Sequence, residues 1–85
     1  MAAVFPFSVL HNFSGGDFLI TYEPFWLTLR ISDETTYTLI HKHHISSSTL
    51  NRMRYNKAIS TATLGRLCEI LKCDVDDILQ YEPDE

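Results

Sequence analysis

The segment TYTLIHKHHISSSTLNRMRY, residues 36–55, decides the fold of this chain. It begins with a helical pattern that places Leu39 and Ile40 on one apolar face, and Thr35 before it is a favourable N-cap. A turn at residues 44–46 follows, and then a second helical pattern. Two short helices separated by a tight turn are typical of a helix-turn-helix motif, which we therefore predict here.

The second helix of this motif has two different faces. We predict it over residues 47–54, with Ser46 as its N-cap and with Leu50 and Met53 in the core. A helix of roughly nine residues is about 13 Å long, and the major groove of B-DNA, about 12 Å wide, admits one such helix. The opposite face, which carries hydrogen-bonding side chains, is therefore predicted to meet DNA. It consists of Ser47, Ser48, Asn51, Arg52 and Tyr55.

The side chains of this face can be assigned to bases or to phosphates. Asn51 can bind adenine and Arg52 can bind guanine through two hydrogen bonds each. The hydroxyl groups of Ser47 and Ser48 can donate to or accept from either base, so we predict these four as the base-reading residues. Other polar side chains are better suited to phosphates, which fix the register of the protein without reading sequence. The predicted phosphate contacts are Thr36, Tyr37, Lys42, Arg54, Tyr55, Asn56 and Lys57.

Positive charge is concentrated in the middle of the chain. The net charge is −4, from 7 Lys plus Arg and 11 Asp plus Glu, yet residues 35–68 contain no carboxylate. A surface of one sign between acidic ends is expected when that surface meets phosphates; the alternative is a solvated basic face without a partner. The cations of this segment are Lys42, Arg52, Arg54, Lys57 and Arg66, to which His41, His43 and His44 can add.

Three further helices complete the predicted domain. Helix one begins at Pro24, because proline suits the first helical position, and ends near Ile31. Helix four is capped by Ser60 or Thr61, and a short fifth helix follows Asp74. The predicted core residues of these helices are Phe25, Trp26, Leu29, Leu64, Leu67, Cys68, Leu71, Val75, Ile78 and Leu79.

The first 22 residues form a separate extension in this prediction. Aromatic and β-branched residues alternate over residues 5–9, and the turn sequence SGGD separates them from a second apolar run at residues 18–22. This pattern predicts a β-hairpin arm that packs on the helices or on a second subunit, and the alternative is an extension without fixed structure. No Lys or Arg precedes the apolar start, so a secretory leader is not expected. The helix-turn-helix domain is accordingly predicted over residues 23–85, with the tail YEPDE frayed.

Several motifs stand in order along the chain: PFW (24–26), TYTLI (36–40), ISSSTL (45–50), ISTATL (59–64), LC (67–68) and DDI (76–78). In this order they resemble the Cro/C1-type (lambda-repressor-like, XRE family) helix-turn-helix regulators, in particular a compact stand-alone bacterial subgroup. The resemblance implies an all-α, five-helix lambda-repressor-like DNA-binding domain. It also implies operator binding, often as a homodimer.

The chain departs from the family pattern at two positions and in its first residues. His44 stands where the family usually has glycine in the turn, so it must adopt a left-handed backbone conformation or shift the turn. Arg54 stands where many relatives carry an acidic residue. Residues 1–19 have no counterpart in the pattern, so their role is not implied by the resemblance.

Other classes of function fit the sequence less well. His41, His43, His44, Cys68 and Cys73 lack the spacing of zinc ligands, and five residues separate the two cysteines, which we expect to be badly placed to reach each other. Neither a nucleophile motif nor a glycine-rich phosphate loop occurs, so an enzyme and a cofactor are not expected. A helix-turn-helix scaffold that docks on another regulator through an apolar arm is the alternative that we keep.

The sequence thus predicts a single small domain that binds double-stranded DNA and regulates transcription. We expect a homodimer reading an inverted repeat, because one small module offers few base contacts. The dimer could use helix five, the arm, or both, and the pattern does not distinguish a repressor from an activator. No apolar run is long enough to span a bilayer and no ligand pocket is evident, so we expect a cytoplasmic protein without a small-molecule ligand.

Overall fold

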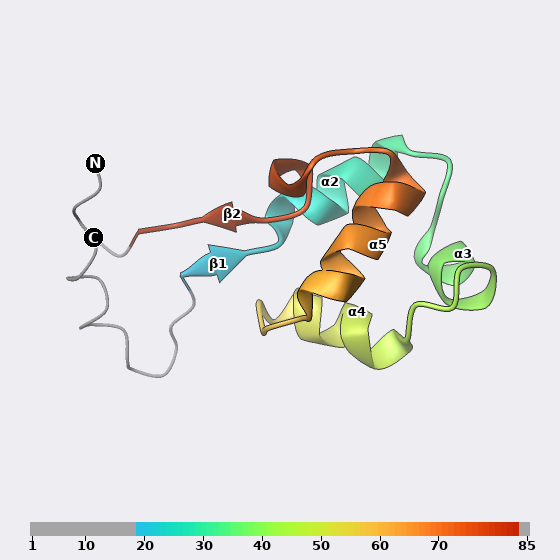
Figure 1. The fold of residues 1–85 in the computed structure, drawn as a ribbon, viewed down its shortest axis with the longest axis horizontal. Helices are drawn as coiled ribbons and strands as arrows, with labels where there is room; N and C mark the ends of the chain where they lie inside the picture. Colours follow the sequence, from blue (N-terminus) through green and yellow to red (C-terminus); the bar gives the residue numbers. More distant parts are fainter. Residues whose placement is uncertain (1–18, 84–85) are drawn as a thin grey trace.

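The computed structural model describes residues 19–83 of the chain. This part contains four α-helices, one short 3₁₀ helix and a two-stranded antiparallel sheet (Figure 1). The elements in chain order are β1 (Ile20–Thr21), α2 (Glu23–Ile31), α3 (Thr36–His41), α4 (Ser47–Arg54), α5 (Thr61–Leu71), η2 (Val75–Asp77) and β2 (Gln80–Tyr81).

The hydrophobic core takes one fully buried side chain from each helical segment. Phe25 of α2, Leu39 of α3, Met53 of α4 and Leu67 of α5 have no exposed surface, nor does Ile78, which follows η2. Burial of each such side chain stabilises the fold by roughly 1.5–3 kcal/mol, so the core holds all the helical segments together. The predicted core is confirmed for these positions. The remaining members are Tyr22, Leu29, Ile45 and Leu50.

Three helices begin at side-chain caps, as the sequence predicts. The hydroxyl oxygens of Thr35, Ser46 and Ser60 accept hydrogen bonds from the backbone amides three residues later, at 3.0–3.1 Å. Each bond satisfies an amide that has no partner within its own helix. The starts of α3, α4 and α5 are therefore specified locally, by the residue that precedes each helix.

The short fifth helix predicted after Asp74 is not confirmed as an α-helix, because this segment forms a single 3₁₀ turn, η2, with Asp74 as its N-cap. The amide of Leu79 donates to the carbonyl of Val75 at 3.0 Å, but an α-helix could continue beyond this turn only if the carbonyls of Asp77 and Ile78 also accepted amides four residues later. The carbonyl of Asp77 instead accepts the hydroxyl of Thr28 at 2.8 Å, and that of Ile78 accepts the amide of Phe25 at 3.1 Å. Both donors belong to α2, so contacts distant in sequence end the helix after one turn.

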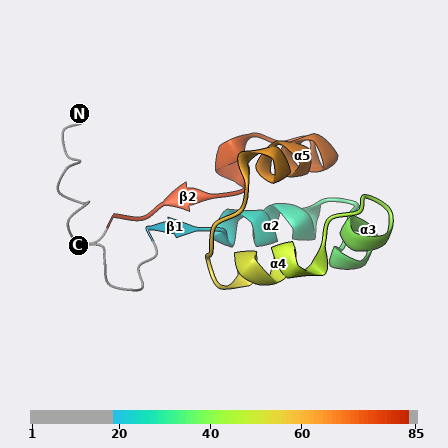
Figure 2. The ribbon, with the colours of Figure 1, turned by 60° about the horizontal axis from the view of Figure 1, so that its bottom comes forward.

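The apolar run at residues 18–22 includes β1, and the partner of this strand within the described residues is β2. An N-terminal hairpin would pair it with residues 5–9, which lie outside the described residues. In residues 19–83, β1 pairs with β2, joining Ile20 to Tyr81 and Thr21 to Gln80. The start of the tail is therefore a strand rather than a frayed end. The two strands lie side by side at one end of the molecule, and α3 lies at the other end in both views (Figures 1 and 2).

None of the helices in residues 19–83 is long and apolar enough to cross a membrane.

Candidate nucleic-acid interface

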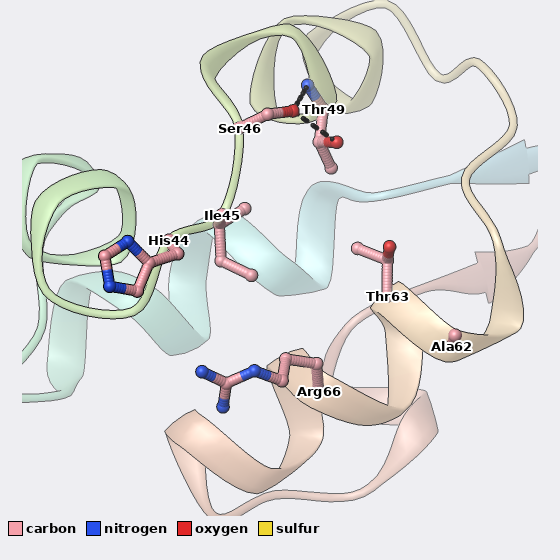
Figure 3. A pocket seen from close by; sticks show the side chains of 7 residues that line it. All are labelled: His44, Ile45, Ser46, Thr49, Ala62, Thr63 and Arg66. Atoms are coloured by element: carbon pink, nitrogen blue, oxygen red, sulfur yellow. Dashed lines mark hydrogen bonds between the residues drawn. The ribbon is translucent and has the colours of Figure 1, made fainter.

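The turn between α3 and α4 is built around a residue with positive φ. His44 has φ of 63°, so of the two expected outcomes, a left-handed residue or a shifted turn, the structure shows the left-handed residue. Ile45 follows and is 6% exposed, and its amide donates to the carbonyl of Leu39 at 2.9 Å. Ser46 then caps α4, with its oxygen 2.9 Å from the hydroxyl of Thr49 (Figure 3). The turn is thus anchored to the core on one side and to α4 on the other.

Helix α4 presents the two faces that its sequence predicts. Thr49, Leu50 and Met53 are buried and hold the helix against the core. The residues of the opposite face are all exposed, so the structure brings the four predicted base-reading residues to one surface. They are Ser47, Ser48, Asn51 and Arg52, with Tyr55 directly after the helix.

Two members of this face are tied to their surroundings by hydrogen bonds. The hydroxyl of Ser48 lies 3.2 Å from that of Ser46, so it belongs to the cap of α4. The Nε of Arg52 donates to the carbonyl of Ala58 at 3.2 Å. This bond uses one of the five donors of the guanidinium group and leaves both terminal nitrogens for a base or a phosphate. Arg52 is therefore oriented by the loop that follows α4.

Asn56 has a structural role that the sequence did not indicate. Its Oδ1 accepts a hydrogen bond from the backbone amide of Tyr22 at 3.0 Å, and its φ is 57°. The phenol of Tyr22 lies nearby, where burial raises its pKa, while the amide of Ile59 and the charge of Arg52 act in the opposite direction. Asn56 thus links the end of α4 to the start of α2. Its Nδ2 group remains for the phosphate contact that we predict.

Arg54 faces α2. Its guanidinium carbon lies 5.1 Å from the centre of the Trp26 ring, which is a cation–π contact. Trp26 is only partly buried, and its ring meets that of Phe25 edge-on with centres 4.6 Å apart. The prediction of Trp26 as a core residue is therefore confirmed only in part, whereas Phe25 is fully buried.

The start of α3 carries a negative charge. The Thr38 hydroxyl donates to Oε1 of Glu34 at 2.7 Å, and Nε2 of His43 lies 3.2 Å from the same oxygen. The hydrogen bond from Thr38, and after it His43 and Lys42, hold the pKa of Glu34 below its usual value despite some desolvation. A phosphate at the first amides of α3 would therefore have to approach from the side opposite this carboxylate. On the exposed side, the ring of Tyr37 packs on that of His41 with centres 4.3 Å apart.

Arg66 lies in α5, away from the exposed face of α4. Its Nη2 donates to the carbonyl of His43 at 3.1 Å, and its Nη1 lies 3.8 Å from Glu69. Its side chain points toward His44 across an open hollow of about 360 Å³ between the turn and α5 (Figure 3). Arg66 therefore fastens α5 to the turn. Of the five Lys and Arg residues between positions 35 and 68, Lys42 and Lys57 are exposed and make no side-chain hydrogen bond, ion pair or cation–π contact within residues 19–83.

The two cysteines are closer than the sequence suggests. The amide of Cys73 donates to the carbonyl of Cys68 at 3.0 Å, and both cysteines are free thiols. Burial, and then the Cys68 thiol together with Asp77 and Asp74, raise the pKa of Cys73 to about 11. The left-handed Lys72 turns the chain back on α5, so Cys73 lies beside Cys68 although the two form no disulfide.

The histidines and cysteines of the described part of the chain do not form a group of three close metal-ligand side chains. Within residues 19–83, the one group of three close ligand-type side chains is acidic and exposed, and all three lie beside η2. These residues are Asp74, Asp76 and Asp77.

Comparison with known proteins places this fold in a family. Residues 29–84 match the model of the Cro/C1-type HTH DNA-binding domain, more than half of the chain, so the chain belongs to this family and the resemblance seen in its motifs is confirmed. Among solved structures, the crystal structure of the transcriptional regulator VanUg, form II, is similar. Its TM-score is 0.70 with 27% sequence identity, covering 87% of this chain and 99% of that one. A search of the curated proteins found no match.

Proposed function

We propose that this protein binds duplex DNA sequence-specifically through α4 and regulates transcription, as a repressor of a bacterial operon in the cytoplasm. One observation carries the proposal. The second helix of the helix-turn-helix buries only three residues and exposes a continuous face of hydrogen-bonding side chains. A soluble domain that needed this helix only for stability would not require amide and guanidinium groups together on that face.

The four base-reading residues act through the edges of bases in the major groove. Asn51 offers one donor and one acceptor to adenine, and Arg52 offers its two terminal nitrogens to guanine. Because the Nε of Arg52 is already bonded to Ala58, less side-chain freedom is lost when the base contact forms. Ser47 and Ser48, at the start of α4, have shorter side chains and contact bases at the edge of the same site.

Phosphates are contacted on both sides of α4. Lys57 and Tyr55 lie after the helix, and Lys42 lies after α3. Asn56 contributes its Nδ2 group. Arg54 contributes its guanidinium group, at the edge of the α4 face next to α2. Thr36 and Tyr37 contribute through the first amides of α3, which have no partner within the helix. These contacts fix register and supply salt-dependent affinity rather than specificity.

A homodimer on an inverted repeat accounts best for specific binding by so small a domain. One module of this kind buries roughly 600–1,000 Å² on DNA, whereas specific complexes commonly bury more. Two copies related by a twofold axis place two copies of α4 in successive major grooves. VanUg, whose structure is similar to this one, is a transcriptional regulator, and this likeness supports the same class of function.

The proposal is tested by selecting binding sites from a random duplex library. The wild type is compared with an Asn51→Ala/Arg52→Ala variant and with an Arg30→Ala control, which removes an exposed cation from α2. We expect the wild type and the control to enrich the same inverted repeat and the double variant to enrich none. Equal enrichment by all three proteins would show that α4 does not read bases.

A second function, docking on another regulator, is favoured by exposed apolar side chains. Leu27 and Ile31 lie one turn apart on α2 and are 56% and 85% exposed. Such docking depends little on ionic strength, whereas phosphate binding weakens steeply with salt. If a Leu27→Ser/Ile31→Ser variant loses its regulatory effect while DNA selection finds no site even for the wild type, this second function replaces the first.

A further inference from the structure

An apolar groove lies between β1, the loop after α4, and α5. Its volume is about 380 Å³, and it is lined mainly by hydrocarbon side chains. Leu19, the first residue that the structure describes, is itself part of the lining. The chain that precedes Leu19 therefore starts at the rim of this groove. The lining residues are Leu19, Ile20, Tyr22, Ile59, Thr61, Leu64 and Leu79, together with the loop from Asn56 to Ala58.

Among residues 19–83, no strand pairs with the edge of β1 that faces this groove. The carbonyl of Leu19 accepts the amide of Glu82 at 2.7 Å, on the β2 side. The amide of Tyr22 points the other way, to Asn56. Because backbone groups alternate in direction along a strand, the amide and carbonyl of Ile20 also point away from β2. An unpaired strand edge beside an apolar hollow accepts an added strand through backbone bonds and side-chain contacts together.

The sequence before Leu19 has the pattern that such a strand needs. A four-residue turn at SGGD, residues 14–17, places Phe13 opposite Phe18 and His11 opposite Ile20. Side chains two residues apart share one face of a strand. The face shared with Ile20 is therefore apolar except for His11. Its members are Phe5, Phe7, Val9 and Phe13, whereas the alternate positions carry Pro6, Ser8, Leu10 and Asn12.

We propose that residues 5–13 occupy this groove as a third strand on the open edge of β1, within the same chain. His11 pairs with Ile20 of β1, and Val9, Phe7 and Phe5 continue over Ile59 and Leu64. Tethering favours this occupant over a second copy, because a short linker gives an effective concentration in the millimolar range. The added strand also covers the loop from Asn56 to Ala58, so it supports the segment that orients Arg52.

The occupant is identified by nuclear Overhauser effects in the full-length protein. We expect contacts from the side chains of Phe7 and Val9 to the methyl groups of Leu64 and Leu79 in a uniformly labelled sample. They should be absent from the intermolecular spectrum of a mixture of labelled and unlabelled chains. Contacts seen only between chains would assign the groove to a second copy and overturn the proposal, as would the absence of any contact from residues 5–13.

Hydrogen exchange provides an independent measurement. In the wild type, the amide of Ile20 should exchange slowly because it donates to the added strand. A Phe7→Asp/Val9→Asp variant should speed its exchange by at least tenfold, whereas an Ile31→Asp control on α2 should not. The amide of Tyr22, bonded to Asn56, reports whether the fold is intact in both variants. Equal exchange at Ile20 in the wild type and the groove variant would contradict the proposal.

Discussion

At the scale of single residues, His44 shows how one backbone angle sets the relation of two helices. Its positive φ allows Ile45 to reach the core while Ser46 caps α4. The left-handed region costs roughly 1–2 kcal/mol for most side chains and is harder still for β-branched ones. The turn is therefore held by its anchors at a position that is intrinsically unfavourable.

The stability of His44 variants should depend on how well the new residue tolerates a positive φ. We expect His44→Val to lower the free energy of unfolding by about 1–2 kcal/mol, because a β-branched residue is strained at positive φ. His44→Gly should be neutral or stabilising by up to about 1 kcal/mol, since relief of strain is partly offset by the entropy of the unfolded chain. Urea unfolding of the wild type and the two variants measures their relative stability. A His44→Val variant as stable as the wild type would contradict the prediction.

The cap of α4 separates the roles of two adjacent serines. Ser46→Ala removes the acceptor for the amide of Thr49 and should cost about 1 kcal/mol of folding stability. Ser47→Ala removes an exposed hydroxyl, so stability should change by less than about 0.5 kcal/mol while DNA affinity falls. Thermal unfolding and a DNA titration on both variants check this assignment. A Ser47 variant that loses stability but not affinity would place Ser47 in the cap.

Glu34 makes stability depend on acidic pH. Its pKa is lowered in the folded state, first by the hydrogen bond from Thr38. A carboxyl of this kind stabilises the fold above its unfolded pKa, and the stabilisation is lost as the pH falls through the lower, folded pKa. We therefore expect the melting temperature to fall below about pH 4.5, and to fall less in Glu34→Gln. Parallel melting curves for both proteins between pH 3 and pH 6 would exclude this role for Glu34.

At the scale of elements, structure that local contacts determine could be predicted from the sequence, whereas structure that distant contacts determine could not. The caps and the apolar stripes of α2 to α5 follow from residues within one or two turns, so the sequence predicts these helices closely. The end of η2 depends on Thr28 and Phe25, about 50 positions earlier, which no local pattern reveals. The same difference applies to the residues of the candidate interface. The exposed face of α4 was predictable, whereas the contacts of Arg52, Arg54 and Asn56 with other elements were not.

The short segment η2 should matter more than its length suggests. Ile78 is fully buried beside it, so Ile78→Ala should cost about 2–5 kcal/mol, enough to unfold a small domain. Val75 is 48% exposed, and Val75→Ala should change stability much less. Circular dichroism during thermal unfolding distinguishes the two variants. Similar losses would indicate that η2 is held by its turn rather than by Ile78.

At the scale of the whole molecule, the protein is acidic, and only some cations of its basic middle segment are without contacts inside the protein. The net charge is −4, and three of the five cations between residues 35 and 68 make contacts within the protein: Arg52, Arg54 and Arg66. Such contacts orient the guanidinium groups but do not remove their charge. Affinity for DNA should therefore depend on a small number of phosphate contacts and respond measurably to the loss of one.

Lys57 tests this expectation. Lys57→Ala should weaken binding to all DNA sequences alike and reduce the slope of log affinity against log salt by about 1. Arg30→Ala should leave the slope unchanged, since Arg30 lies on α2. Titrations at three or more salt concentrations give both slopes. An unchanged slope for Lys57→Ala would remove this residue from the phosphate contacts.

The pairing of β1 with β2 also bears on the order in which the chain folds. It joins segments about 60 positions apart, whereas α3, the turn and α4 close over short distances, so its loop-closure entropy is the largest in the fold. A ladder of two residue pairs returns little energy for that cost. The strands should therefore assemble after the helices and separate before them, and reversible opening of the native protein should start at this end while the helix-turn-helix remains intact.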